Sequence, residues 1–168
     1  ETAMLWRFEC ADDPDVEVFL SRDADSRLSG REKRAVEAWL ASGKQYHVMR
    51  DHPYHCTAML GGMWGCRSSG LGQIKGWLAD WSAADREPRK GIDQAFLRER
   101  VWPLARKNCL LHDPCFSGRA FPDATRDADG VLFVGECFTA ENRPASTADR
   151  DRLRSWEKKW QHLRWLRR

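Results

Sequence analysis

The sequence predicts an α/β fold with a mixed, mainly parallel sheet flanked by helices. Short apolar segments rich in β-branched and aromatic residues alternate along the chain with segments of helical periodicity, and this alternation is typical of sheets covered by helices. The expected strands are residues 16–20, 46–50, 109–113 and 130–136. Polar residues directly follow several of these segments, where ligands of open α/β sheets bind.

The first strand is expected between two helices. Residues 4–8 have apolar side chains at helical spacing, and the acidic, Pro-containing segment 11–15 ends that helix. Ser29 begins a Ser-x-x-Glu capping box, which predicts the start of a second helix. An apolar stripe runs through this helix, and Gly43 is expected to end it.

The chain beyond residue 60 is predicted to contain three further helices connected by loops. Residues 60–72 are rich in glycine and are expected to form a loop. Apolar residues at helical spacing predict a helix over 74–81. Residues 92–107 are also helical, with Pro103 bending or ending the helix. A long loop precedes residue 130, and one helix is expected from Ser146 onward.

Length and composition indicate one α/β domain, residues 1–145, followed by a basic Trp-rich helix, residues 146–168. Residues 145–168 contain eight Lys and Arg against three Asp and Glu. A solvated helix face is the favoured interpretation of this charge, and contact with anionic lipid or nucleic acid is the alternative. The six cysteines form no Cys-x-x-Cys pair, which favours reduced thiols in a cytoplasmic protein. No apolar run has the length of a membrane span.

An Asp-x-Asp pair, Asp23 and Asp25, directly follows the first predicted strand. Two carboxylates in one turn can bind Mg²⁺ or Mn²⁺, which prefer oxygen ligands and keep positions open for phosphates. Arg22 and Arg27 flank the pair, and guanidinium groups suit phosphate recognition. The pattern therefore indicates a diphosphate site. The alternative is a solvated turn in which the acids pair with these arginines.

A second polar group, Arg50, Asp51, His52 and His55, follows the second predicted strand. Its alternative interpretation is an ordinary polar turn. Further along the chain, Asp93 stands at a helix start and His112 at a strand end. Asp93 is either a helix cap or a functional carboxylate. His112 is either a nitrogen ligand of a metal or a hydrogen-bonded loop histidine.

The segment "LGGMWG" has glycines that let backbone approach a ligand and a tryptophan that can stack on a sugar or base. It lacks both the Gly-x-Gly-x-x-Gly pattern and the Walker lysine, which excludes a dinucleotide or P-loop fingerprint. A tight turn beside a core tryptophan is the alternative for Gly61, Gly62 and Trp64.

These motifs, in this order, resemble those of nucleotide-sugar-dependent glycosyltransferases of the GT-A type. The likeness is greatest to bacterial glycosyltransferase-like proteins of polysaccharide biosynthesis. It covers residues 4–137 and is carried by "WRF", "RDxDSR…RE", "RDHPxH…GGMWG", "DQxFL" and "HD". The resemblance implies transfer of a sugar from a nucleoside-diphosphate donor to a saccharide or other acceptor, with Mn²⁺ or Mg²⁺ as cofactor.

The resemblance also implies roles for individual residues. Asp23 and Asp25 would bind the metal with His112 as third ligand, and Asp93 would be an acceptor-side carboxylate or base. Gly61, Gly62 and Trp64 would border the donor sugar and the acceptor. The expected donor-binding set is Arg22, Arg27, Arg50, Asp51, His52, Gly61, Gly62 and Trp64.

The chain departs from the GT-A pattern at its start. GT-A domains usually have a nucleotide-binding βαβ segment ahead of the Asp-x-Asp pair, whereas here Asp23 lies close to residue 1. We therefore expect a fragment, a truncated form, or a variant that completes its sheet in a homodimer.

Two other functions stay open at this point. One is a metal-dependent phosphohydrolase using His52, His55, His112 and Asp113. The other is a non-enzymatic interaction module that binds a partner or a membrane surface through its basic tail, residues 146–168. We expect no transmembrane segment and no nucleic-acid partner.

Overall fold

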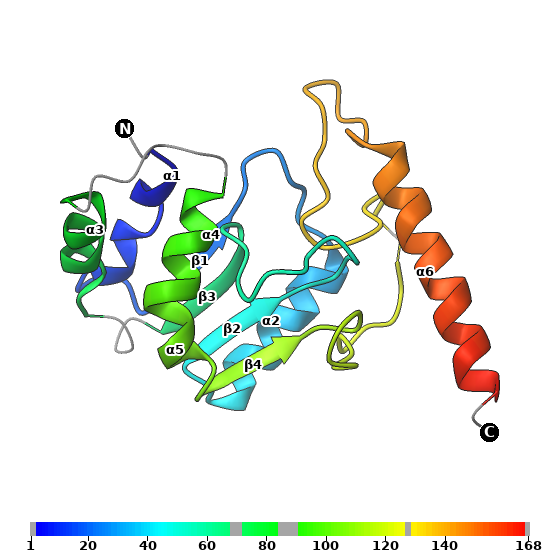
Figure 1. Cartoon of the computed structure of the whole chain (residues 1–168), viewed down its shortest axis with the longest axis horizontal. Helices are drawn as coiled ribbons and strands as arrows, with labels where there is room; N and C mark the ends of the chain where they lie inside the picture. The colour runs from blue at the N-terminus through cyan, green and yellow to red at the C-terminus, as the bar shows by residue number, and fades with distance from the viewer. Residues whose placement is uncertain (1–2, 68–71, 84–90, 127–128, 167–168) are drawn as a thin grey trace.

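The computed structural model describes residues 3–67, 72–83, 91–126 and 129–166. Its four strands form one sheet, in the order β1 (Val18–Arg22), β3 (Met63–Arg67), β2 (Tyr46–Met49) and β4 (Cys109–His112). Helices precede, separate and follow these strands (Figure 1). They are α1 (Ala3–Trp6), η1 (Glu9–Asp12), α2 (Gly30–Ser42), α3 (Ile74–Ala83), α4 (Ile92–Phe96), η3 (Leu97–Val101), α5 (Trp102–Ala105) and α6 (Thr147–Leu166).

The sheet is mixed, as predicted, but the expected parallel majority is not confirmed. Only β2 and β4 pair in parallel, and β3 is antiparallel to both of its neighbours. The reason is that β3 returns directly beside β2 after a connection without a crossover helix, which allows only antiparallel pairing. As a result, the carboxyl ends of β1, β2 and β4 and the amino end of β3 lie along one edge, called the rim below.

Two predicted segments differ from the structure. Residues 63–67, expected within a glycine-rich loop, form the central strand β3. Gly65 is required there, because a Cβ at this position would lie 2.7 Å from the Phe19 carbonyl oxygen. Residues 130–136, expected to be a strand, are a turn in which the Glu136 N–H donates to the Phe133 carbonyl. Hydrophobicity alone did not separate a buried turn from a strand.

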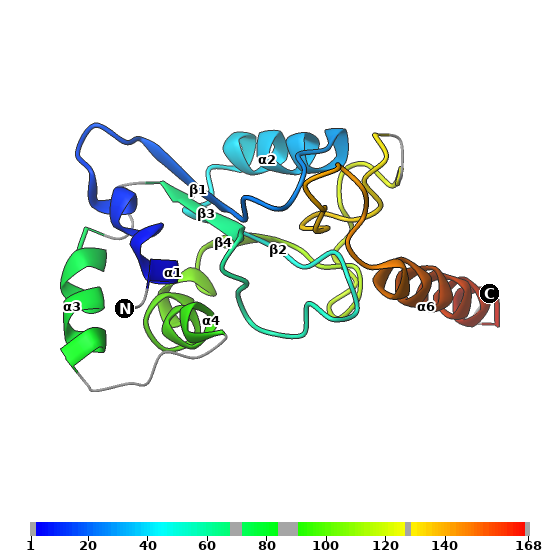
Figure 2. The ribbon, with the colours of Figure 1, turned by 90° about the horizontal axis from the view of Figure 1, so that it is seen from above.

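Helices cover both faces of the sheet (Figure 2). α2 lies on one face, and α1, α4 and α5 lie on the other. Side chains alternate along each strand, so His47 stacks on Trp39 of α2 at 5.3 Å between ring centroids, while Tyr46 and Val48 face the opposite layer. The two faces differ in character: a small apolar cluster and buried ion pairs lie under α2, and the larger apolar core lies under α4.

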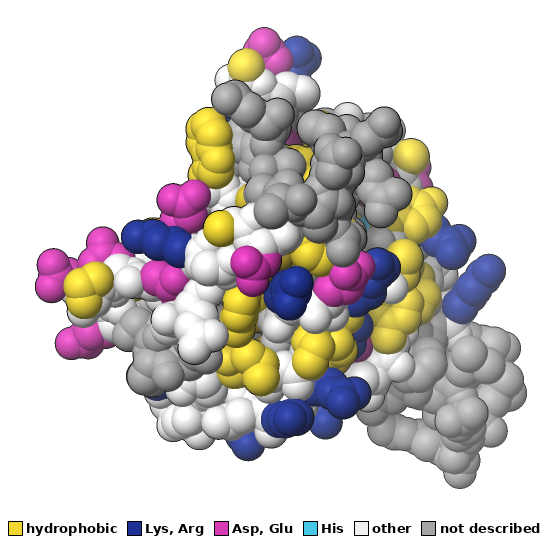
Figure 3. Space-filling model, turned by 60° about the vertical axis from the view of Figure 1, so that its left-hand side comes forward, with side chains coloured by type: hydrophobic (Ala, Val, Ile, Leu, Met, Phe, Trp, Pro, Cys, Tyr) yellow, Lys and Arg dark blue, Asp and Glu magenta, His cyan; other side chains and the backbone are white. Residues whose placement is uncertain are grey.

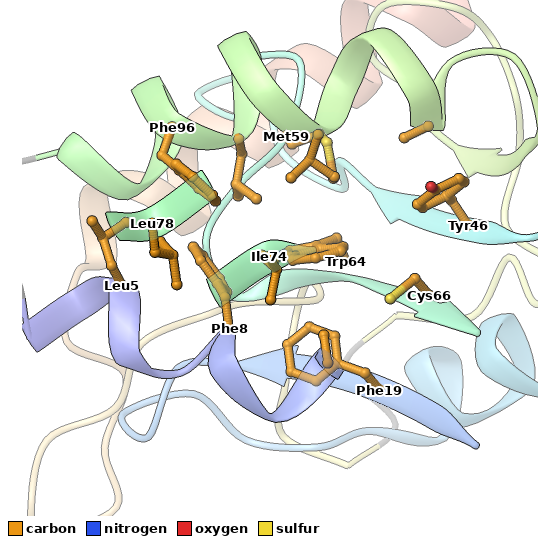
Figure 4. Packing of buried hydrophobic residues seen from close by; sticks show 14 of the residues in the cluster. Leu5, Phe8, Phe19, Tyr46, Met59, Trp64, Cys66, Ile74, Leu78 and Phe96 are labelled. Atoms are coloured by element: carbon orange, nitrogen blue, oxygen red, sulfur yellow. The ribbon is translucent and has the colours of Figure 1, made fainter. Parts of the chain in front are cut away.

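The apolar core lies between the sheet and the helices opposite α2 (Figure 4). Trp64 of β3 is fully buried at its centre, with Phe8 and Phe19 edge-on to its ring at 5.5 and 5.1 Å. Phe96 and Trp81 extend this aromatic cluster. Burying one such side chain stabilises the fold by about 1.5–3 kcal/mol, so this layer is the main source of stability.

The predicted helix boundaries of α2 are confirmed by its caps. The Ser29 hydroxyl accepts a hydrogen bond from the Glu32 N–H at 3.2 Å, and Gly43 adopts φ 68° at the other end. The box is only half formed, because the Glu32 carboxylate pairs with Arg22 instead. Beyond Gly91, α4, η3 and α5 are consecutive, and η3 is a π-helical segment just before Pro103. In place of the bend predicted at Pro103, the helix has a wider π-helical turn just before this residue.

α6 lies apart from the sheet at the C-terminal end of the molecule (Figure 1). Its apolar contact with the domain is through Leu153 and Trp156, which pack on Leu132 and Phe133, and Glu157 and Arg150 add ion pairs to Arg126 and Glu136. The side chains of residues 160–168 lie outside the described part, so the predicted partner surface there is not described. Among the described helices, none is long and apolar enough to cross a membrane.

The surface around α1 and α3 mixes charge and hydrophobicity. Figure 3 shows acidic and basic side chains next to each other around exposed hydrophobic ones. Trp6 is among the exposed hydrophobic residues, with 58% of its surface accessible. Acidic side chains are most frequent at the left edge of this view, and basic ones at its lower edge.

Candidate functional site

The candidate site lies at the β1 end of the rim, where three separate motifs meet. Asp23 follows β1, Gly61 and Gly62 precede β3, and Asp93 stands in the first turn of α4. The antiparallel pairing of Arg22 with Met63 brings the first two segments together. The Ser21 hydroxyl donates to the Gly61 carbonyl at 2.6 Å and fixes the turn against β1.

Asp23 lies directly against Gly62. A Cβ added to Gly62 would lie 2.3 Å from Asp23 Oδ2 and 2.8 Å from the Asp23 backbone nitrogen. Only glycine leaves room for this backbone approach. The Asp23 side chain remains 46% exposed and forms an ion pair with Arg7. It is therefore a carboxylate that a ligand can reach.

Asp93 lies against the other glycine of the same turn. A Cβ on Gly61 would lie 1.9 Å from Asp93 Oδ2. The Asp93 side chain is only 8% exposed, and its Oδ2 is 3.7 Å from Arg7 Nη2. One guanidinium thus stands between two carboxylates that come from distant parts of the sequence.

Asp25 and Asp23 both lie near Cys137. The backbone N–H of Phe138 donates to the Asp25 carbonyl at 2.7 Å, which fixes the two segments together. Partial burial raises the pKa of the Cys137 thiol to about 11, and the charge and hydrogen bond of Asp25, then the charge of Asp23, add to this shift. The Asp-x-Asp pair therefore forms one patch of negative charge.

The two flanking arginines have protein partners rather than open positions. Arg22 pairs with Glu32 beneath α2, although its Nη2 is buried without a hydrogen-bond partner among the described residues. Arg27 donates from Nε to Asn142 Oδ1 at 2.9 Å. The alternative interpretation was a turn in which the aspartates pair with Arg22 and Arg27. Asp23 pairs with Arg7 instead.

The second polar group is built into the fold. Asp51 is completely buried and accepts two hydrogen bonds of 2.8 Å from Arg31. Arg126 and the Val134 N–H complete its shell at 2.9 and 3.0 Å. Asp51 therefore has a structural role, because it joins α2, the end of β2 and the segment before α6. Both of its carboxylate oxygens accept these hydrogen bonds, which leaves neither oxygen free for the predicted contact with a donor.

The neighbours of Asp51 have comparable roles. Arg50 pairs with Asp113 at 2.8 Å. His52 accepts from the Tyr54 N–H at Nδ1, so its Nε2–H donates to the Asp149 carbonyl of α6 at 2.9 Å. The phosphohydrolase alternative needs His52, His55, His112 and Asp113 together. Asp113 is buried and paired with Arg50, and among the described residues no three of these side chains form a group that could hold a metal ion.

His112 lies at the far end of the rim from Asp23. β1 and β4 are separated by two strands, which corresponds to about 14 Å at ordinary strand spacing. Its Nδ1 is 2.9 Å from His47 Nε2, and its ring stacks on Phe121. Burial is the main reason that the pKa of His112 is lowered to about 4. His112, which was predicted to be the third metal ligand, is thus one member of a buried histidine pair with His47.

Within the described residues, no three His, Cys, Asp or Glu side chains are arranged to hold a metal ion. Asp23 and Asp25 alone still fit part of a Mg²⁺ or Mn²⁺ site, because these ions are often bound by one or two carboxylates plus substrate phosphates. Trp64 matches the alternative of a core tryptophan, because its ring is fully buried in the apolar core. Gly61 and Gly62 do border the candidate site.

Three residues that contact the predicted site residues were not themselves predicted. Arg7 lies in an expected helix, and only its presence in the "WRF" segment marked it. Cys137 has no neighbouring cysteine in the sequence. His47 sits inside a strand, where a buried pair with His112 has no sequence signature. Contacts this far apart in the chain become visible only in three dimensions.

Comparisons with known proteins give no family. A scan against protein-family models, a search of the curated proteins and a search of the solved structures each found no match.

Proposed function

We propose that this chain contributes the metal- and acceptor-side part of a sugar transferase that uses nucleoside-diphosphate donors. The observation that carries the proposal is the meeting of Asp23 and Asp93 on the Gly61–Gly62 turn. Both glycines are needed because any side chain there would collide with these carboxylates. A turn built to let two acids approach each other supports a polar site rather than a packing contact.

The two carboxylates have environments suited to different roles. Asp23, with Asp25 beside it, is exposed and lies in a patch of negative charge, which suits electrostatic attraction of a divalent cation. When bound, such a cation would neutralise charge on the departing diphosphate. Asp93 is nearly buried at the start of α4, which suits a group that holds or moves a proton.

In an inverting transfer the roles are as follows. The acceptor hydroxyl oxygen forms a bond to the anomeric carbon of the donor sugar, and the bond from that carbon to the diphosphate oxygen breaks. The acceptor proton moves to the Asp93 carboxylate, and the bonding electrons leave with the nucleoside diphosphate. Asp93 is the group we assign to the proton, and Asp23 with Asp25 to the diphosphate end.

The experiment is a calorimetric titration of UDP and of GDP, each with Mn²⁺, into wild type, Asp23→Asn and Asp25→Asn. Loss of either carboxylate is expected to weaken binding at least about tenfold, or 1.4 kcal/mol. Asp151→Asn, on the exposed surface of α6, is the matched control and should bind as wild type does. Equal binding by all four proteins, or none, would contradict the proposal.

Asp93→Asn separates binding from chemistry. It is expected to keep nucleoside-diphosphate binding, because Asp93 lies on the acceptor side. Turnover, measured as release of nucleoside diphosphate from UDP- and GDP-sugars, should fall by about 10²–10⁴-fold, the usual contribution of general acid–base catalysis.

A further inference from the structure

Arg7 stands between the two carboxylates of the candidate site. Its Nη1 pairs with Asp23 Oδ1, and its Nη2 is 3.7 Å from Asp93 Oδ2. The guanidinium is also fixed from its own end of the chain, because Nε donates to the Met4 carbonyl at 2.9 Å. Arg7 therefore approaches from the N-terminal segment and connects the segment after β1 with α4.

The charge balance leaves room for a second cation. Among the described residues, Arg7 is the cation paired with Asp23 and with Asp93. Two carboxylates and one guanidinium sum to one negative charge, and nearby Asp25 raises this to two. A divalent ion that binds Asp23 would meet Arg7 at the same carboxylate, and two cations near one carboxylate repel each other.

We propose that Arg7 competes with a divalent cation for Asp23. Through its contacts with both carboxylates, Arg7 is a positioning residue that holds Asp23 and Asp93 across the Gly61–Gly62 turn. Cation binding at Asp23 displaces the guanidinium, which then remains near Asp93 and faces the anionic donor. This inference rests on the proposed function, since it concerns the same site.

The test is a calorimetric titration of Mn²⁺ alone into wild type and Arg7→Gln. Removal of the competing charge should tighten Mn²⁺ binding about two- to fivefold, as expected for losing a partly exposed ion pair. A purely structural role predicts the opposite, because a distorted site binds metal less well. Asp23→Asn should abolish binding in both backgrounds. Arg98→Gln, which removes an exposed arginine paired with Glu99, should leave Mn²⁺ affinity unchanged.

A second variant covers the case in which Arg7→Gln does not fold. Arg7→Lys keeps the charge, but its single ammonium group cannot pair with both carboxylates at once, so it should bind Mn²⁺ more tightly than wild type by a smaller factor. In parallel, the Arg7 Nε–H resonance of wild type should shift on addition of diamagnetic Mg²⁺. Unchanged or weaker Mn²⁺ binding by the folded variants, or no binding by any protein, overturns the competition.

The outcome can be separated from that of the proposed function. If the variants show tighter Mn²⁺ binding but none of the proteins binds UDP or GDP, the competition stands and sugar transfer fails. If the nucleotides bind through Asp23 while Arg7→Gln leaves Mn²⁺ affinity unchanged, sugar transfer stands and the competition fails.

Discussion

The two ends of the rim contain the same kinds of residue in opposite physical states. At the β1 end, Asp23 is exposed, has one arginine partner and lies against glycine. At the β2–β4 end, Asp51 has no exposed surface and its oxygens are fully used by two arginines and a backbone N–H. One end has carboxylate oxygens available to a ligand, whereas the other uses them to connect parts of the chain.

This difference separates the two Arg-Asp motifs, which look alike in the sequence. A carboxylate that is buried with full hydrogen bonding is costly to disturb, but it has little left to offer a ligand. A carboxylate with partial solvation costs little to disturb and can exchange partners. Stability and ligand binding should therefore respond to mutation at opposite ends of the rim.

Replacement of Asp51 should give the largest change in stability. Asp51→Asn removes the charge that neutralises Arg31 and Arg126, both largely buried. Breaking such a pair from one side costs about 3–5 kcal/mol, measured as the free energy of unfolding in urea. Asp23→Asn is the control and should cost under about 1 kcal/mol, as for exposed pairs. Equal losses at the two positions would contradict the comparison.

The histidine pair should make the β2–β4 end sensitive to acid. Burial, then the charges of His112 and Arg22, lowers the pKa of His47 to about 3. Between the unfolded value of 6.5 and this folded value, the unfolded state binds the proton and the native state does not. Stability is therefore complete above pH 6.5 and falls as the pH decreases, by about 2 kcal/mol for this group between pH 7 and 5.

The measurement is the urea midpoint at pH 7 and pH 5. His47→Gln should have a correspondingly smaller loss between these two pH values than wild type. His52→Gln is the control, because a hydrogen bond to the Asp149 carbonyl offsets part of the lowering of the His52 pKa. A wild-type loss that is unchanged by His47→Gln would assign the acid sensitivity to other groups.

Alanine substitutions in the Gly61–Gly62 turn should lower the stability of the protein by different amounts. A Cβ at Gly62 meets the Asp23 backbone nitrogen, which cannot rotate away, whereas a Cβ at Gly61 meets the carboxylate tip of Asp93. Gly62→Ala should therefore destabilise the protein by about 1.5 kcal/mol, a typical cost of overpacking, and Gly61→Ala by less. Thermal unfolding of the two variants checks the order. Equal melting temperatures would contradict it.

Much of the fold followed from local pattern, and less of the site did. Ser29 and Gly43 define α2 because caps depend on near neighbours, and the period of Ile74 to Trp81 is a local property. The central strand β3 was missed because Gly65 and the glycines before the strand resemble a loop until Trp39 and Phe19 are placed around Gly65. The meeting of Asp23 with Asp93 depends on which strand returns beside which. That depends on long-range packing, and no local pattern in the sequence indicates it.

The same limit explains why the sequence leaves two interpretations open for His112 and for Trp64. Histidine and tryptophan are both common in ligand sites, and these two residues belong to the motifs "HD" and "GGMWG". Their side chains, however, point into the protein: His112 lies against Phe121 and His47, and Trp64 lies between Phe8 and Phe19. A residue's position relative to a motif in the sequence does not indicate the side of the sheet it faces.

Cys137 offers the smallest but most local test of the exposed end. The charge and hydrogen bond of Asp25 contribute, after burial, to the raised pKa of its thiol, about 11. Asp25→Asn removes that charge, so the pKa should fall and the thiolate fraction at pH 8.5 should rise. Each unit of pKa is a tenfold change in thiolate, and we expect alkylation of Cys137 by iodoacetamide to accelerate about three- to tenfold.

Peptide mass spectrometry resolves Cys137 from the other exposed thiols, Cys10 and Cys56, whose rates should not change and which serve as internal controls. If a cation binds Asp23 and Asp25, Mg²⁺ should accelerate the same alkylation in wild type and have less effect in Asp25→Asn. An unchanged rate for Cys137 in the variant would mean that the Asp-x-Asp pair does not act on this position as one patch of charge. The exposed end of the rim would then lose the electrostatic character that distinguishes it from the buried end.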